Sequence, residues 1–515
     1  MKLRKLKREQ HTTHLHPPRH PGTPAELVAL GRQYQQAGNF LQAKQCLQQA
    51  IRQRPRDADL ANELGTIYYA LGERKKEREC YERCLQLDPD HGSSLYNLAN
   101  IHRANHSLDQ AEQLYLRALA VNPDDADAFN NLGCLYLDQK GYAAALGQLQ
   151  QALLLAPNRP DILVNHGLCL YRSGRVHEAI AQYDLALRHD PLYRAALVSK
   201  ADALCCSAPA TAWKEFLQFA LARIDSLPER IGLSVTYAIC CWLTMDFDRL
   251  ATTLGELGEI MPQAAVDING PGNLAFYLYL KGLANQAPPL DQESEPLAPL
   301  FVIGDSHALG PANREILFQG QPHRVHAHII IGGKAWHLAM TSGNHHQAAF
   351  RAIMETIPRR AKLLLILGEI DCRSDQGIMH HHQRSKRPLA DIIRQTMTGY
   401  LDYVLAAAAA KEIECIFSGV PAPDETLVNR LPAERRGGYL RMVEQVNTLL
   451  QQLARERQVS FLDVYRATVT DRKTASSQFY LDGCHLDPRF YETSIDAYLC
   501  PGDGERHPHP VVVAQ

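Results

Sequence analysis

Apolar and polar positions repeat with a period of 34 residues over residues 24–193. Each repeat contains two helical stretches separated by a short break such as AGNF or LGER, and a fixed period of this kind is typical of a stack of similar units. A proline, which cannot continue a helix, ends every repeat. These prolines are Pro55, Pro89, Pro123, Pro157 and Pro191. The pattern predicts an α-solenoid of five helix pairs.

A small residue and a bulky residue recur together in the second helix of each pair. The bulky residue comes three positions before the small one, and this spacing lets two antiparallel helices approach and interlock. The pairs are Leu47 and Ala50, Tyr81 and Cys84, Tyr115 and Ala118, Leu149 and Ala152, and Tyr183 and Ala186. Together with a Leu-Gly pair or a close variant in each first helix, this pattern resembles the tetratricopeptide repeat, in five copies.

The resemblance implies a concave groove that takes a protein or peptide partner. Asn97, Asn131 and Asn165 occupy the same place in the first helix of the third, fourth and fifth repeats. In the family this helix lines the groove, and an asparagine there can hold a peptide backbone through its donor and its acceptor. The alternative is that asparagine is an ordinary residue of the repeat at this place. Residues 194–286 are predicted to be a degenerate repeat and irregular helices that cap the solenoid.

The pattern changes after residues 287–299, which contain several prolines and acidic residues and are predicted to be a linker. In residues 300–495, runs that are apolar throughout, such as PLFVIGD and KLLLILGEID, alternate with helical stretches. This alternation is typical of parallel strands that are covered by helices on both faces. We expect a three-layer α/β domain with a parallel sheet, followed by a C-terminal tail, residues 496–515.

Residues that can carry chemistry follow these strands, and ligands of such sheets bind at the carboxyl ends of the strands. Ser306 follows the first strand, and Asp482 and His485 follow the last. A hydroxyl is a poor nucleophile until a base takes its proton, and a base works best when a carboxylate fixes its tautomer. Ser306, His485 and Asp482 can supply these three functions, and the Asp-x-x-His spacing fits one short turn.

These residues resemble the conserved blocks of the SGNH (GDSL-type) hydrolase superfamily. Gly-Asp-Ser at residues 304–306 matches the first block, and Asp482 and His485 match the last. Gly332 or Gly333 matches the glycine whose backbone N–H helps to stabilise the oxyanion. The resemblance spans about residues 299–495. It implies a flavodoxin-like fold and hydrolysis of oxygen esters, often acetyl groups on sugars or short acyl esters, without a metal or a cofactor.

The third block departs from the family. It usually reads Gly-x-Asn-Asp, with an asparagine that donates to the oxyanion, whereas this chain has Gly368-Glu369-Ile370-Asp371. Loss of one such donor typically costs about 10²–10³ in rate. Arg373 could supply a donor instead, or Glu369, Asp371 and Arg373 could form a structural cluster of ion pairs.

Composition indicates the environment and the partners. Charged residues are 21% of the chain and the net charge is −2, so no strong field attracts nucleic acid. No apolar stretch approaches the roughly 18–20 residues of a membrane span. Residues 1–23 are basic without the apolar stretch of a secretory signal, and they are predicted to be a disordered tail. Thirteen cysteines without paired CxxC motifs favour reduced thiols in a cytoplasmic protein.

The sequence therefore predicts a cytoplasmic serine ester hydrolase with a repeat arm that binds a protein partner. Two alternatives stay open. The first is a non-catalytic scaffold with a degenerate hydrolase domain, for which Ile370 is the motivating residue. The second is an acyltransferase that acts on a polysaccharide or on a protein held by the repeats.

Overall fold

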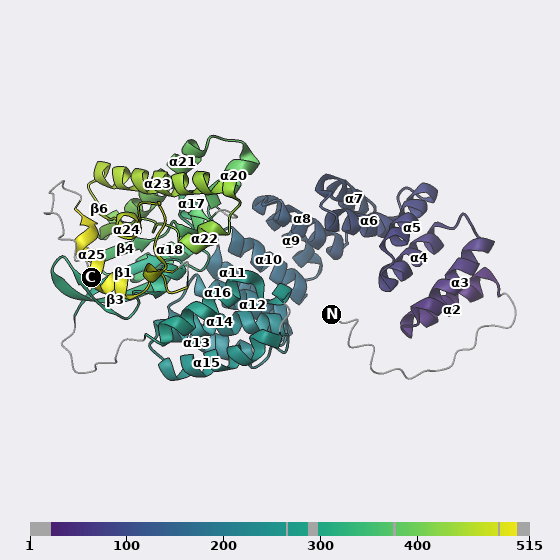
Figure 1. The fold of residues 1–515 in the computed structure, drawn as a ribbon. Helices are drawn as coiled ribbons and strands as arrows, with labels where there is room; N and C mark the ends of the chain where they lie inside the picture. Colours follow the sequence, from purple (N-terminus) through teal and green to yellow (C-terminus); the bar gives the residue numbers. More distant parts are fainter. Residues whose placement is uncertain (1–21, 264–265, 287–296, 374–376, 483–484, 502–515) are drawn as a thin grey trace. The chain divides into compact units, whose positions relative to one another are not determined.

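The computed structural model describes residues 22–263, 266–286, 297–373, 377–482 and 485–501 (Figure 1). The chain divides into two compact units, residues 1–169 and residues 170–515. Most of the predicted N-terminal tail, linker and C-terminal tail lies outside the described residues.

Close packing of small against bulky residues explains the helical repeats. A Cβ at Gly65 would lie 2.5 Å from the ring of Tyr81, and a Cβ at Gly133 would lie 2.7 Å from Leu149, so glycine is needed where these helices touch. The predicted small and bulky residues of all five repeats are buried. The helices of the five repeats are α2 (Pro24–Gln36), α3 (Phe40–Gln53), α4 (Ala58–Leu71), α5 (Arg74–Leu87), α6 (Gly92–Ala104), α7 (Leu108–Val121), α8 (Ala126–Asp138), α9 (Tyr142–Leu155), α10 (Pro160–Arg172) and α11 (Val176–His189).

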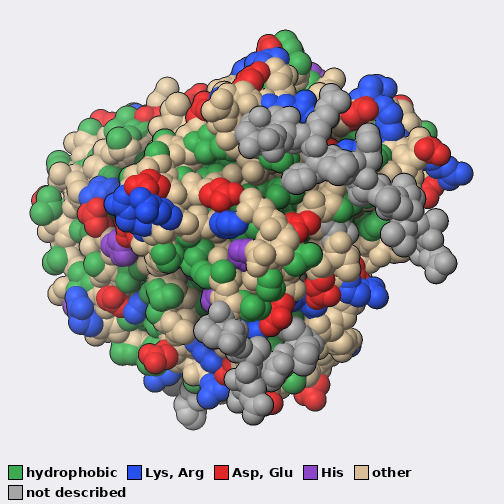
Figure 2. All heavy atoms as spheres, turned by 90° about the vertical axis from the view of Figure 1, so that its left-hand side faces the viewer, with side chains coloured by type: hydrophobic (Ala, Val, Ile, Leu, Met, Phe, Trp, Pro, Cys, Tyr) green, Lys and Arg blue, Asp and Glu red, His purple; other side chains and the backbone are tan. Residues whose placement is uncertain are grey.

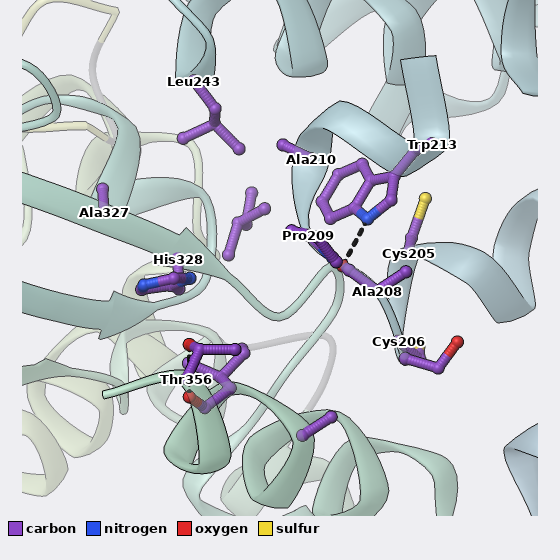
Figure 3. Close-up of a pocket in the computed structure, with 14 residues that line it drawn as sticks. Cys205, Cys206, Ala208, Pro209, Ala210, Trp213, Leu243, Ala327, His328 and Thr356 are labelled. Carbon is purple, nitrogen blue, oxygen red and sulfur yellow. Dashed lines mark hydrogen bonds between the residues drawn. The ribbon is translucent and has the colours of Figure 1, made fainter. Parts of the chain in front are cut away.

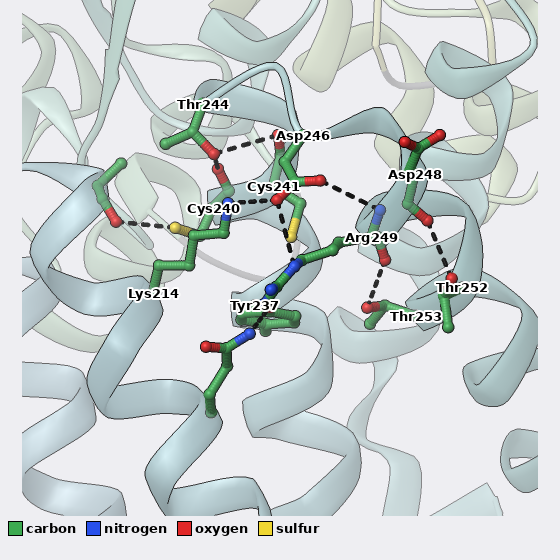
Figure 4. Close-up of polar contacts among 12 residues, drawn as sticks. Lys214, Tyr237, Cys240, Cys241, Thr244, Asp246, Asp248, Arg249, Thr252 and Thr253 are labelled. Carbon is green, nitrogen blue, oxygen red and sulfur yellow. Dashed lines mark hydrogen bonds and ion pairs between the residues drawn. The ribbon is translucent and has the colours of Figure 1, made fainter.

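The helices that follow the repeats belong to the second unit and enclose an apolar cluster around Trp213 and Trp242. Polar contacts fix their ends: Asp246 accepts a hydrogen bond from the backbone N–H of Arg249 at 3.2 Å and forms an ion pair with Lys214 (Figure 4). We call these helices the helical cap. Its elements are α12 (Arg194–Cys205), α13 (Ala210–Leu221), α14 (Leu227–Leu243), α15 (Phe247–Ile260), η1 (Met261–Gln263) and α16 (Val266–Ala284).

Seven strands of the described residues form one sheet in the order β2-β3-β1-β4-β5-β6-β7. They are β1 (Ala298–Gly304), β2 (Glu315–Phe318), β3 (Gln321–Ile329), β4 (Lys362–Ile366), β5 (Glu414–Ser418), β6 (Ser460–Leu462) and β7 (Leu499–Cys500). The five central strands are parallel, whereas β2 and β7 at the edges are antiparallel to their neighbours. The sheet is therefore mixed, where the sequence predicted only parallel strands.

The two antiparallel edge strands have local causes. Gln319 and Gly320 join β2 to β3 with φ angles of +51° and +71°, the left-handed conformation that a two-residue hairpin turn requires. At the other edge, Leu499 and Cys500 pair with β6, so the described fold extends beyond the predicted domain end at residue 495. An edge strand as short as this one presents few unpaired backbone groups.

Helices cover both faces of the sheet (Figure 1). Leu363 and Leu365 of β4 belong to an apolar cluster with α18 (His345–Thr356), α21 (Leu389–Ala409) and α23 (Ala433–Glu456). Leu364 and Ile366 face the opposite side, where α25 (Arg489–Tyr498) packs. The remaining short elements are η2 (Ser306–Leu309), α17 (Ala335–Ala339), α19 (Glu369–Cys372), α20 (Gly377–Ser385), α22 (Glu425–Asn429), α24 (Val464–Thr468) and η3 (Ser477–Phe479).

Candidate active site

Three of the predicted sequence blocks start side by side at the carboxyl ends of β1, β3 and β4. Gly304 ends β1 and is in register with Ile329 of β3 and Ile366 of β4. Its carbonyl accepts a hydrogen bond from the backbone N–H of Ile330 at 2.8 Å. A Cβ at Gly304 would lie 2.5 Å from the carbonyl oxygen of Ile366, so only glycine allows the strands to meet here.

Ser306, His485 and Asp482 form a hydrogen-bonded chain at this edge. Ser306 is the first residue of η2, and its Oγ lies 2.8 Å from Nε2 of His485. Nδ1 of His485 lies 2.7 Å from Oδ2 of Asp482. Ser306 is 6% exposed and His485 is 4% exposed. The arrangement contains a hydroxyl, a base in contact with it and a carboxylate in contact with the base, which are the parts of a nucleophilic triad.

Two contacts of the Asp482 carboxylate with His485 explain why a spacing of three residues suffices. Oδ1 of Asp482 accepts the backbone N–H of His485 at 2.8 Å, while Oδ2 contacts the imidazole. The backbone N–H of Leu481 donates to the carbonyl of His485 at 2.8 Å. Because a carboxylate only accepts hydrogen bonds, this pairing places a proton on Nδ1 and leaves Nε2 to accept the proton of Ser306.

A second acid–histidine pair lies beside the triad. Oδ1 of Asp305 accepts the backbone N–H of His307 at 2.9 Å and lies 2.8 Å from its Nδ1. Burial disfavours the charged imidazole of His307, but the Asp305 carboxylate outweighs burial and raises the pKa of His307 to about 9. The rings of His307 and His485 lie 4.7 Å apart between centroids.

The surroundings keep His485 in the form that a base requires. Burial is the main cause that lowers the pKa of His485; Asp482 opposes this effect and the charged His307 adds to it. A histidine whose pKa lies below its ordinary value of about 6.5 is neutral at pH 7. It can therefore accept a proton there.

The two glycines after β3 differ in their hydrogen bonding. Gly333 donates its backbone N–H to the carbonyl of Ile330 at 2.8 Å. Gly332 is exposed, has a φ of +65°, and its backbone N–H has no partner among the described residues. Of the two predicted positions, Gly332 is thus the one whose N–H can bind an anion.

The third block makes structural contacts. Asp371 is fully buried, and its carboxylate accepts the backbone N–H groups of Ala335 and Trp336 at 2.7 and 3.1 Å. Burial raises the pKa of Asp371 to about 7. Arg373 and Glu369 form an ion pair with N···O distances of 2.8–3.1 Å. Asp371 therefore holds the start of α17, directly after the two glycines, and Arg373 is engaged by Glu369.

The three predicted groove asparagines have different surroundings in the repeats. Asn97 lines a groove of about 810 Å³ formed by α4, α5 and α6. Asn131 donates its amide to Tyr96 and Asn100 at 2.8 and 2.9 Å, and Asn165 donates its amide to a neighbouring asparagine at 2.9 Å. Asn131 and Asn165 thus make hydrogen bonds between repeats, while Asn97 faces the groove.

No function was predicted from the sequence for two residues beside the triad, Tyr279 and His307. Tyr279 of α16 stacks on His485, with 3.8 Å between ring centroids and 11° between ring planes. No periodicity or motif in the cap marks this tyrosine. His307 is adjacent to Ser306 in the chain. The sequence does contain a signal for this residue, because Asp305 lies two positions earlier and its carboxylate can reach the imidazole.

A cavity of about 150 Å³ lies in the second unit between the cap and the α/β layers (Figure 3). Its lining includes Cys205 and Trp213 of the cap, His328 of β3 and Thr356 of α18. None of the triad residues lines it, so this cavity is separate from the candidate active site.

Three further observations concern surface charge, membrane-spanning helices and metal sites. On the face drawn in Figure 2, acidic and basic side chains are intermixed. No helix in the described parts of the chain has the length and apolar character needed to cross a membrane. Within the described residues, no cluster of three or more histidine, cysteine, aspartate or glutamate side chains is arranged to hold a metal ion, and the described cysteines are free.

Comparisons with known proteins concern the repeats. Residues 28–92, 96–161, 130–194 and 164–204 match a family model described as tetratricopeptide repeat. Similar solved structures include pilF of Pseudomonas aeruginosa, with 24% identity over 39% of this chain and 88% of that chain and a TM-score of 0.34. YrrB, a tetratricopeptide protein with an unusual peptide-binding site, has 22% identity over 36% and 91% of the two chains and a TM-score of 0.28.

A tetratricopeptide repeat protein from Parabacteroides merdae has 16% identity over 50% of this chain and 98% of that chain, with a TM-score of 0.39. No curated protein matches the chain. Residues 28–204 therefore contain tetratricopeptide repeats.

Proposed function

We propose that the second unit is a serine ester hydrolase of the SGNH type. The observation that carries this proposal is the hydrogen-bonded chain from Asp482 through His485 to Ser306. Its members come from the two ends of the α/β region, and its serine and histidine are almost completely buried. A hydroxyl, a base and a carboxylate aligned in this order are the parts that activate a nucleophilic serine.

The geometry supports a two-step acyl transfer to water. In the first step His485 Nε2 takes the proton of Ser306 as Oγ attacks the acyl carbon. The bond between that carbon and the alcohol oxygen then breaks, and His485 gives the proton to the departing alcohol. Water then attacks the acyl-serine with His485 again as base, which releases the acid and restores Ser306. Asp482 stabilises the transient imidazolium.

The backbone donors of the oxyanion hole come from two strand ends. In the proposed mechanism, the N–H groups of Ser306 and Gly332 stabilise the negative oxygen of the tetrahedral intermediate. The family's third donor has no counterpart in the side chain of Ile370. The proposed enzyme therefore has a rate handicap of about 10²–10³ unless another donor approaches.

The order of the parallel strands also supports the proposal. Numbered along the chain, the five parallel strands β1, β3, β4, β5 and β6 lie in the order 2-1-3-4-5, which is the flavodoxin-like order. In that order the crevice lies at the carboxyl ends of the strands on either side of the first strand. Ser306 follows the first strand, at this position.

We further propose that the repeats bind a peptide segment of a protein partner in the groove beside Asn97. This groove also contains Tyr69, Arg74, Arg78 and Asn100. The side chains supply an aromatic surface, positive charges and amide groups, and these can bind both the backbone and the acidic side chains of a peptide.

Hydrolysis of p-nitrophenyl acetate tests the hydrolase proposal. We expect turnover by the full chain, and a loss of about 10³-fold or more in kcat for Ser306→Ala and for His485→Ala. Ser418→Ala is the matched control, because Ser418 is also buried at a strand end but its Oγ donates to the carbonyl of Gly419 at 2.9 Å. A folded wild-type chain that is inactive on acetyl, butyryl and longer esters, or an active Ser306→Ala variant, would contradict the proposal.

A further inference from the structure

We infer that the helical cap is part of the catalytic site, with Tyr279 of α16 as a positioning residue that holds the imidazole of His485. The inference rests on the proposed function only for the reaction in which His485 acts as the base. The contacts that support it come from two helices of the cap and reach both sides of the triad.

Tyr279 forms one wall of the histidine site. Its ring is nearly parallel to that of His485, at 3.8 Å between centroids, and Tyr279 is 1% exposed. Asp482 holds the imidazole through a hydrogen bond at Nδ1. Hydrogen bonds at both ring nitrogens still let the imidazole rotate about the line through them, whereas a flat aromatic ring against its face blocks this tilting.

The C-terminal end of α16 lies against the segment that carries Asp482 and His485. A Cβ at Gly282, one turn after Tyr279, would lie 2.9 Å from the side chain of Leu481, so the helix and the loop are in close contact. Beyond the helix end, Gln286 donates its side-chain amide to Asp487 at 3.5 Å. These contacts begin just before the catalytic turn in sequence and end just after it.

A second cap helix, α14, binds the segment that carries Ser306. The indole N–H of Trp242 donates to the carbonyl of Leu309, the last residue of η2, at 2.9 Å. The side chain of Asn313 donates to the carbonyl of Trp242 at 2.7 Å. The cap therefore contacts both chain segments whose alignment brings Ser306 Oγ to His485 Nε2.

The charged and titratable groups around His485 come from several elements. They are Asp482, His307 on η2, Asp305 directly before η2, Glu369 on α19 and Tyr279 on α16. Removal of the Tyr279 ring admits water to the face of the imidazole and weakens the effect of burial, so the pKa of His485 should rise towards its ordinary value.

The test compares Tyr279→Leu, which removes the flat ring, with Tyr279→Phe, which keeps it. We expect Tyr279→Leu to lower kcat for p-nitrophenyl acetate by about ten- to a hundredfold, the scale of a small misplacement of a catalytic group. KM should stay within about twofold, because the cap ring orients the base and does not bind the ester in the ground state. The acid limb of the pH profile should move to higher pH, and Tyr279→Phe should restore both kcat and the profile.

Tyr237→Leu is the matched control for general loosening of the cap. Tyr237 is a buried tyrosine of α14 whose hydroxyl contacts Gln218 and Arg249 (Figure 4). Equal losses in Tyr237→Leu and Tyr279→Leu, or an unchanged kcat and pH profile in Tyr279→Leu, would overturn the inference. Tyr279→Met, which keeps much of the volume without a flat ring, replaces the leucine variant if that variant does not fold.

A measurement that needs no catalysis separates this inference from the proposed function. The imidazole resonance that His485→Gln removes identifies His485 in the NMR spectrum of the histidine-labelled chain. Titration should give a higher pKa for His485 in Tyr279→Leu than in wild type, whether or not the protein hydrolyses esters. An identical titration in the two proteins would overturn the inference even if the hydrolase proposal holds.

Discussion

Oδ2 of Asp371 accepts a hydrogen bond from the backbone N–H of Ala335 at 2.7 Å. This bond joins α19, which follows β4, to the segment after β3. The third sequence block therefore holds the segment that contains Gly332 and Gly333. Gly332 lies three residues before Ala335. The position of its N–H, the proposed oxyanion donor, therefore depends on a carboxylate from another strand end.

Asp371→Ala should destabilise the second unit and lower kcat. The variant leaves the backbone N–H groups of Ala335 and Trp336 without their acceptor, and each unpaired buried donor costs about 1–3 kcal/mol. Urea unfolding followed by tryptophan fluorescence measures this unit alone, because the three tryptophans, Trp213, Trp242 and Trp336, all lie within residues 170–515.

Asp371→Asn keeps one acceptor oxygen and is the control for this prediction. Its free energy of unfolding should lie between those of the wild type and of Asp371→Ala. A variant Asp371→Ala that is as stable as the wild type would show that the carboxylate does not hold this segment.

His307 should make the stability of the second unit depend on pH. Because the Asp305 carboxylate raises the pKa of His307 to about 9, above the value of about 6.5 in an unfolded chain, the folded state binds the proton more tightly. The stabilisation is complete below about pH 6.5 and is lost as the pH rises through about 9. Unfolding of the wild type at about pH 6.5 and about pH 9.5 measures this loss.

His307→Gln should remove most of that loss, whereas His380→Gln, which changes an exposed histidine of α20, should keep it. His307→Gln also removes a positive charge beside His485. The acid limb of the pH profile of ester hydrolysis should therefore move to higher pH. An identical loss of stability in wild type and His307→Gln would assign the pH dependence to other groups.

Ile370→Asn tests whether the oxyanion hole lacks a donor. If the asparagine reaches the oxyanion, turnover of an acetyl ester should rise, by at most about 10²–10³-fold. Ile370→Val, which only shortens a buried side chain, should give no gain. No gain in Ile370→Asn, together with a large loss in Arg373→Ala, would instead indicate that Arg373 leaves Glu369 and donates to the oxyanion during the reaction.

Asn97→Ala should weaken binding of the peptide partner without a change in ester hydrolysis. Loss of one backbone hydrogen bond in the groove costs about 0.5–1.5 kcal/mol, which is about two- to tenfold in affinity. Asn131→Ala is the comparison, because its amide already binds Tyr96 and Asn100. Partners recovered from lysate with the full chain supply the ligand, and equal affinities of wild type and Asn97→Ala would contradict a role of this groove residue.

Local patterns in the sequence were sufficient to predict the repeats and to select Ser306, Asp482 and His485, which the fold brings into contact. The repeats follow from a proline period and from small residues that contact bulky ones, such as Gly65 with Tyr81 and Gly133 with Leu149. The Asp482–His485 pairing follows from a spacing that one turn can close. The edge strand β2 was missed, although Gly320 in its turn was a usable signal.

Contacts between distant segments could not be predicted in the same way. Tyr279 and His485 are far apart in sequence, and no repeat or motif relates them. The sequence pattern also predicted a linker between two domains at residues 287–299, whereas the cap and the sheet belong to one compact unit. Packing of the cap against η2 and against Leu481 decides this grouping, and it depends on the shapes of two surfaces that form only when distant segments fold together.

Labelling with a fluorophosphonate probe tests the central claim most directly, because the probe forms a stable bond only with a serine whose proton is taken by a base. We predict that the wild-type chain carries one label, that peptide mapping places the label on Ser306, and that Ser306→Ala and His485→Ala carry none while Ser418→Ala labels as the wild type does. An unlabelled wild-type chain with intact tryptophan fluorescence, or a label that persists in Ser306→Ala, would contradict the claim that Asp482, His485 and Ser306 form an active triad.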